Sequence, residues 1–244
     1  METREFGISV VSFFPWSLGF GGAVRASRMA NDSGIKKLQL LPLRGYDTNS
    51  VNRLPARGVI SWEGPWNYGS FWKAFRRALG CAGEDYPTPL DWVVFGKNPM
   101  DPQIFGRLFP NALHVSHDSR EKLSIYEVHP EGGLPSNKMS ALCWDTWHVR
   151  RPYRNGNPSP FQWQRLLEEW KNQIALIHVH PTGSEVESLL TRRVQGELQY
   201  MLRLLAKASP NAPIVLEVAP SLGTSSQVVK RMSSLRQSVA EIMG

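Results

Sequence analysis

The sequence places an acid and a histidine at metal-ligand spacing, Asp145 and His148, directly after the apolar run of residues 139–143. A carboxylate and an imidazole at the end of one strand could bind a divalent metal or hold a polar substrate. Chance supplies many such pairs, but three other apolar runs of this chain also end in candidate ligands. These ligands are Glu127, the pair His178 and His180, and Glu217. Together the four runs predict a polar site built at the ends of strands.

Both strands and helices are expected to position these side chains. Short apolar or alternating patterns predict β-strands at residues 7–13, 37–43, 59–62, 112–116, 123–127, 141–145, 174–180 and 213–218. Helical patterns cover residues 21–31, 70–79, 160–170, 184–208 and 227–243, and Ser184 with Glu187 has the form of a capping box. Strands that alternate with helices indicate parallel crossover units.

The length of 244 residues suits one α/β barrel domain. We therefore expect an α/β fold, a (β/α)8 TIM barrel that forms a single domain over residues 1–244. An open doubly wound sheet is the alternative. In a barrel, the carboxyl ends of the strands carry the active site, and the candidate ligands lie at those ends.

The formal net charge of the chain is +7. This surplus would suit a phosphorylated substrate or a polyanion. The basic pairs Arg76–Arg77, Arg150–Arg151 and Arg192–Arg193 are scattered along the chain, however, and a dedicated nucleic-acid surface gathers such residues in one stripe. Nucleic acid is therefore a less favoured partner. The sequence leaves the oligomeric state open, and a homo-oligomer is compatible with it.

The amino-terminal segment lacks the basic region of a signal peptide, because residues 1–5 include two acids. The apolar segment of residues 8–20 is too short to span a bilayer and contains Pro15. The two cysteines, Cys81 and Cys143, do not make a disulfide framework. These features predict a cytoplasmic protein with reduced thiols and no membrane partner.

The chain resembles the xylose-isomerase-like TIM-barrel superfamily, which includes sugar isomerases, ketose 3-epimerases and the endonuclease-IV type of apurinic endonuclease. The string Asp145-Thr146-Trp147-His148 is similar to the Asp-Thr-Phe-His of ketose 3-epimerases. Residues 192–198 resemble the Arg-Val-Pro-Gly segment of the family, and residues 214–217 resemble its final strand. The chain departs from the family at residues 181–183, where Pro-Thr-Gly replaces the polar cluster that usually follows strand seven.

The resemblance implies a metal site made of Glu127, Asp145, His180 and Glu217, at the ends of strands five to eight. This mixed set of carboxylates and an imidazole suits Mn²⁺, Mg²⁺, Co²⁺ or Zn²⁺. His178 is the alternative histidine, because residues two apart face the same side of a strand. We favour His180, which lies nearer the carboxyl end of its strand.

The resemblance also implies a metal-dependent sugar or sugar-phosphate isomerase or epimerase. Glu127 and Glu217 would act as general base and acid, and would move a proton through a cis-enediolate. A further set of side chains is expected to contact the substrate: His148, His178, Arg192, Glu63 and His117. His117 follows the strand expected at residues 112–116 and could also serve as an additional metal ligand.

Two other functions stay open at this point. An apurinic endonuclease-type phosphodiester hydrolase would suit the basic charge, but the Asp-x-His pair of that group does not occur in residues 181–196. A barrel that has lost catalysis and serves as a binding protein is compatible with the departure at residues 181–183. We therefore expect a small-molecule sugar or sugar phosphate as the partner, ahead of nucleic acid.

Overall fold

The structure is a computed structural model of the whole chain. It describes residues 4–19, 21–40, 54, 59–63, 93–95, 124–127, 141–150, 160–191, 196–220 and 223–244. Within these ranges, the side chains of residues 59–63, 93–95, 124–127, 141, 142, 148 and 160–162 are not described.

Eight parallel strands form a closed barrel in which each strand pairs with its neighbours in chain order, and β8 returns to pair with β1. The strands are β1 (Phe6–Ser9), β2 (Lys37–Leu40), β3 (Val59–Glu63), β4 (Val93–Phe95), β5 (Ser124–Glu127), β6 (Ala141–Asp145), β7 (Ile174–Val179) and β8 (Ile214–Leu216). The expected α/β barrel is therefore confirmed, and the open sheet is excluded.

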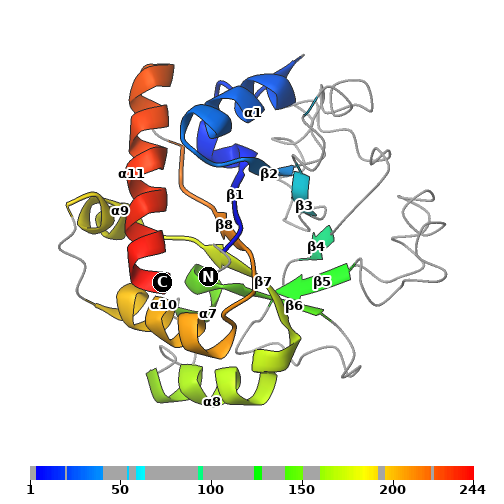
Figure 1. Cartoon of the computed structure of the whole chain (residues 1–244), viewed down its shortest axis with the longest axis vertical. Coiled ribbons are helices and arrows are strands. Elements are labelled where there is room, and N and C mark those ends of the chain that lie inside the picture. Colours follow the sequence, from blue (N-terminus) through cyan, green and yellow to red (C-terminus); the bar gives the residue numbers. More distant parts are fainter. Residues whose placement is uncertain are drawn as a thin grey trace, which may run out of the picture.

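In Figure 1 the helices lie above, to the left of and below the strands. They are α1 (Gly22–Asp32), α7 (Thr146–Arg150), α8 (Pro160–Trp170), α9 (Gly183–Leu190), α10 (Glu197–Ala208) and α11 (Ser225–Met243), with short 3-10 helices η1 (Val10–Phe13) and η2 (Lys171–Gln173). The long helix α11 packs against α1, α9 and α10, and α10 also packs against α8. These helices form an outer layer around part of the barrel.

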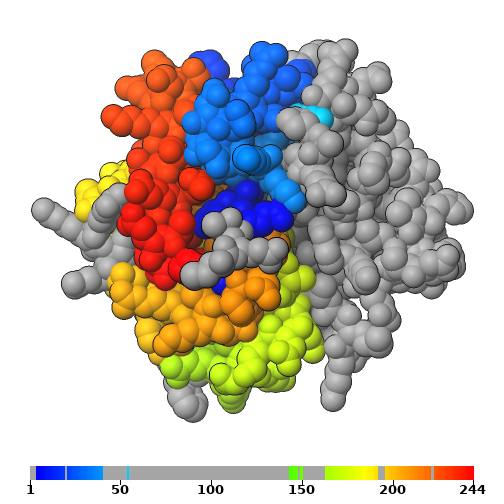
Figure 2. All heavy atoms as spheres, viewed as in Figure 1, coloured from blue at the N-terminus to red at the C-terminus, as the bar shows by residue number. Residues whose placement is uncertain are grey.

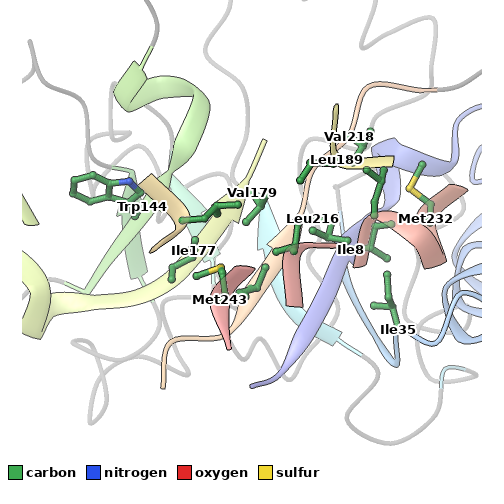
Figure 3. Packing of buried hydrophobic residues seen from close by; sticks show 14 of the residues in the cluster. Ile8, Ile35, Trp144, Ile177, Val179, Leu189, Leu216, Val218, Met232 and Met243 are labelled. Atoms are coloured by element: carbon green, nitrogen blue, oxygen red, sulfur yellow. The ribbon is translucent and has the colours of Figure 1, made fainter. Parts of the chain in front are cut away.

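The apolar core lies between the strands and these helices. Ile8 and Leu216 are register partners on β1 and β8, and they lie side by side in this layer with Met232 of α11 (Figure 3). Cys143 and Val215 are also buried but do not belong to this cluster, which agrees with side chains that point into the barrel. Because successive side chains of a strand point alternately outward and into the barrel, the inward positions are available for polar groups at the barrel mouth.

The fourth strand differs from the sequence prediction. β4 consists of Val93–Phe95 and pairs with both β3 and β5, so the prediction of residues 112–116 as the fourth strand was wrong. Residues 112–116 lie outside the described residues. β-branched and aromatic side chains explain why 93–95 forms a strand, although three residues are too few to show a period. His117 therefore does not follow the fourth strand.

Two further predictions need correction. The first strand ends at Ser9 and continues as η1, because the Ser9 hydroxyl accepts from the Val11 N–H at 3.4 Å and starts a helical turn. The helix expected over residues 184–208 is two helices, α9 and α10. α10 begins after Gly196, whose φ of 137° is a backbone conformation that cannot continue a helix.

The capping box of α9 also lies earlier than expected. Thr182, rather than Ser184, is the N-cap, and Glu185, rather than Glu187, is its partner. The Thr182 N–H donates to Glu185 Oε2 at 2.8 Å. Thr182 takes this position because its backbone stays extended, with ψ 168°.

Among the described residues, no helix is both long enough and apolar enough to cross a membrane.

Candidate metal centre

Three potential ligands converge where neighbouring strands of the barrel end. Asp145 is the last residue of β6, His180 follows β7 directly, and Glu217 follows β8 directly. One ligand atom from each lies within 4.8 Å of the other two. Metal bonds of about 2.0–2.2 Å place neighbouring ligand atoms roughly 3–4 Å apart. A small contraction of this group would therefore let all three reach one divalent cation, and the oxygen and nitrogen donors suit such an ion.

Asp145 is held rigidly at the junction of β6 and α7. Its side chain is 1% exposed, and its Oδ1 accepts from the Trp147 N–H at 2.7 Å. Its Oδ2 lies 3.6 Å from the Nδ1 atoms of both His178 and His180. A carboxylate anchored through one oxygen presents the other in a fixed direction, as a metal ligand requires.

His180 is positioned through its backbone by Thr146, the first residue of α7. The His180 N–H donates to the Thr146 Oγ1 at 2.9 Å, and Thr146 is fully buried. The imidazole is 26% exposed, and the Trp147 ring lies 6.1 Å from it, centroid to centroid. The junction of β6 and α7 therefore positions both Asp145, which ends β6, and His180, which follows β7.

Glu217 is fixed by its own backbone and by that of the next residue. The Glu217 N–H donates to the Val179 carbonyl at 3.0 Å, and the Val218 N–H donates to the Ser12 hydroxyl at 2.9 Å. The carboxylate is 15% exposed, which makes it more accessible than that of Asp145. A solute that enters the barrel mouth can therefore meet Glu217 more readily than Asp145.

Below these ligands lies His178, which is fully buried inside the barrel beside Asp145, its register partner. Its Nδ1 lies 3.4 Å from Glu217 Oε2, and its Nε2 lies 2.8 Å from the amide nitrogen of Gln39 on β2. Gln39 was missed in the sequence. A polar residue between Leu38 and Leu40 was the available signal, because alternation turns it to the face opposite the apolar cluster.

An ion pair connects α7 to α9 beside the site. Arg150 donates to both carboxylate oxygens of Glu185, one at 3.0 Å, and its Nε donates to the Thr146 carbonyl at 2.7 Å. Burial raises the pKa of the Glu185 carboxyl, but the hydrogen bonds from Arg150 and from Thr182, together with the Arg150 charge, outweigh it and hold this pKa below its ordinary value. The spacing of Thr182 and Glu185 is that of a capping box, so the sequence carried a signal for the bond between these two residues but not for the ion pair with Arg150.

The remaining predicted site residues are placed only in part. Glu127 ends β5 and Glu63 ends β3, both at the same end of the barrel as Asp145, and His148 lies in α7. The side chains of these three residues are not described. Arg192 and His117 lie outside the described residues. The roles predicted for these five residues stay predictions.

A cavity of about 580 Å³ lies at the other end of the barrel, lined by the starts of β1 and β2 and the end of α11. Figure 2 shows the start of β1 (dark blue) between α11 (red) and the α1–β2 segment (lighter blue). Active sites of (β/α)8 barrels lie at the carboxyl ends of the strands, so this cavity does not belong to the candidate metal centre.

No family model matches this chain, and no curated protein matches its sequence. Among solved structures, the fold is similar to a sugar phosphate isomerase/epimerase from Parabacteroides distasonis, with 12% identity, a TM-score of 0.54, and coverage of 100% of this chain and 96% of that one. It is also similar to D-psicose 3-epimerase from Clostridium cellulolyticum, solved with D-tagatose, with 14% identity, a TM-score of 0.51, and coverage of 98% and 96%. Endonuclease IV from Thermus thermophilus matches with 13% identity, a TM-score of 0.49, and coverage of 97% and 99%.

The first two of these structures cover nearly the whole of both chains. At these identities the likeness concerns the fold. It agrees with the closed barrel of eight parallel strands in this chain.

Proposed function

We propose that this protein is a divalent-metal-dependent isomerase or epimerase of a sugar or sugar phosphate. The observation that carries the proposal is the convergence of Asp145, His180 and Glu217 at the carboxyl ends of three neighbouring barrel strands. The likeness in fold to a sugar phosphate isomerase/epimerase and to a psicose 3-epimerase supports it. We also propose that residues 1–244 act as one domain.

In this proposal Asp145, His180 and Glu217 hold the cation, and Glu127 at the end of β5 is the fourth ligand. A divalent cation bound there supplies a Lewis acid that polarises the carbonyl and hydroxyl oxygens of a sugar. The residue identities fit Mn²⁺, Mg²⁺, Co²⁺ or Zn²⁺. The site would thus favour substrates with adjacent oxygen atoms.

The acid–base roles follow from accessibility. Glu217 is 15% exposed, whereas Asp145 is 1% exposed and bonded to the start of α7. We therefore assign to Glu217 the removal of a proton from the carbon between the two substrate oxygens, and to Asp145 a purely ligating role. Glu127 would start protonated and deliver its own proton to the resulting cis-enediolate, and exchange with solvent would then return both carboxyl groups to their starting states. His148, Arg192 and Glu63 would contact substrate hydroxyl or phosphate groups.

Isotope exchange tests the chemistry directly. Wild-type protein loaded with Mn²⁺ and incubated in D₂O with a panel of ketoses and ketose phosphates should place deuterium on the carbon beside the carbonyl. Glu217→Gln should abolish this exchange, whereas Glu169→Gln, which changes an exposed carboxylate on α8, should leave it intact. Exchange by Glu217→Gln at the wild-type rate would contradict the assignment of the base.

Metal content separates this proposal from its alternatives. After equilibrium dialysis, Asp145→Asn and Glu217→Gln should retain less metal than wild type, while Glu169→Gln should match it. Equal metal content in all four proteins would refute the metal centre. Metal-dependent cleavage of abasic DNA without exchange into any sugar would favour the phosphodiester hydrolase instead.

A further inference from the structure

Two buried polar side chains meet inside the barrel below the metal ligands. Gln39 comes from β2 and His178 from β7, and both are fully buried. The amide nitrogen of Gln39 lies 2.8 Å from the Nε2 atom of His178. An amide nitrogen donates and does not accept, so with the Gln39 amide turned in this way Nε2 is the acceptor of the hydrogen bond. In a neutral imidazole with that arrangement, the proton resides on Nδ1.

The contacts of Nδ1, the other ring nitrogen of His178, also favour a proton on Nδ1. The Nδ1 atom of His178 lies 3.4 Å from Glu217 Oε2 and 3.6 Å from Asp145 Oδ2. A lone pair on Nδ1 would face two carboxylates and would be repelled by both, whereas an N–H there attracts them. The contacts on the two ring nitrogens come from different strands and agree on one tautomer.

We propose that His178 is a permanent Nδ1–H donor that positions the carboxylates of Asp145 and Glu217, and that Gln39 is the positioning residue which maintains this tautomer. His178 is then not a metal ligand, because its Nδ1 carries a proton and its Nε2 accepts from Gln39. This assigns the ligating role on β7 to His180. The consequence for metal affinity rests on the proposed function, but the tautomer itself does not.

The order of groups around this site is the reverse of the usual one. Histidine ligands commonly donate their second N–H to a carboxylate that lies farther from the ion. Here the carboxylates are the ligands, and the Nδ1–H of a histidine behind them faces both, 3.4 Å from Glu217 and 3.6 Å from Asp145. Such a donor holds two like charges at the spacing that one cation can bridge. Loss of outer partners of this kind commonly weakens metal binding by about tenfold to a hundredfold.

The test is a ¹⁵N spectrum of the histidine side chains in the metal-free full chain at constant neutral pH, with His178→Gln used to assign the signals. We expect a protonated Nδ1 and an unprotonated Nε2 for His178. Addition of Zn²⁺ should shift the His180 signals and leave this pattern in place. A protonated Nε2, an averaged pair of signals, or a Zn²⁺-ligated His178 would overturn the inference.

Gln39→Met tests the positioning role, because it keeps the length of the side chain and removes the donor. We expect a shift of the His178 Nε2 signal and about a tenfold to hundredfold loss of Zn²⁺ affinity. Gln237→Met, an exposed change on α11, should alter neither quantity. An unchanged Nε2 signal and unchanged affinity in Gln39→Met would refute the role of Gln39.

The two proposals fail in different ways. Wild-type protein that binds no Zn²⁺ but shows the Nδ1–H tautomer would refute the metal centre alone. Wild-type protein that binds Zn²⁺ with His178 in the opposite tautomer would refute this inference alone. If Gln39→Met does not fold, the wild-type spectrum still decides the tautomer.

Discussion

Thr146→Val should weaken both the fold and the proposed metal centre, because Thr146 connects the ends of β6 and β7. Thr146 is fully buried, and its hydroxyl accepts from the His180 N–H at 2.9 Å in a partly buried hydrogen bond. Valine has a similar shape but no acceptor, so the His180 N–H would lose this bond. An unsatisfied buried polar group costs about 1–3 kcal/mol, which for a chain of this size lowers Tm by roughly 2–12 °C.

Thr146→Ser is the matched control. It keeps the acceptor and removes one methyl group, which should cost about 0.8 kcal/mol of folding free energy. We expect urea unfolding to rank the proteins wild type, Thr146→Ser, Thr146→Val, and Zn²⁺ titration to show weaker binding only in Thr146→Val. Thr146→Val within about 0.5 kcal/mol of wild type and with unchanged Zn²⁺ affinity would refute the proposed link.

Three other outcomes can be measured by unfolding experiments. The pKa of the Glu185 carboxyl is held below its ordinary value in the folded chain. Its ion pair with Arg150 therefore stabilises the fold at a pH above the ordinary pKa, and this stabilisation is lost as the pH falls through the folded pKa. Glu185→Gln should therefore lose less stability than wild type on acidification. Leu205→Ala should cost about 2–5 kcal/mol in urea unfolding, because Leu205 is fully buried in α10, and a smaller loss would place it outside the core. Thr224→Ala should cost about 1 kcal/mol, because the Thr224 hydroxyl accepts from the Gln227 N–H at the start of α11; equal stability would show that the cap contributes nothing.

The convergence of three candidate ligands could be predicted because each follows an apolar run directly. Asp145, His180 and Glu217 are each the last residue of a barrel strand or the residue after it, and parallel strands bring such positions to one end. Sequence spacing alone could not choose between His178 and His180, because both face the same side of β7. That choice depends on depth in the barrel, where His178 is fully buried and His180 is 26% exposed.

Other features depend on contacts that distance in sequence conceals. Gln39 meets His178 across the barrel, 139 residues away, and no local pattern encodes that contact. β4 is only three residues long, too short for a period to identify it, and the apolar pattern of residues 112–116 is longer. The division between α9 and α10 depends on the backbone conformation of Gly196, which cannot continue a helix. Sequence propensity does not determine this conformation, because glycine can adopt several.

A crystal of the full chain grown with Zn²⁺ and measured at the zinc absorption edge tests the metal centre most directly. We predict an anomalous peak about 2.0–2.2 Å from ligand atoms of Asp145, His180 and Glu217, with the His178 ring outside the coordination sphere. A peak bonded to His178, or bound zinc only at other sites, would contradict the assignment of these three strand-end residues as the metal ligands.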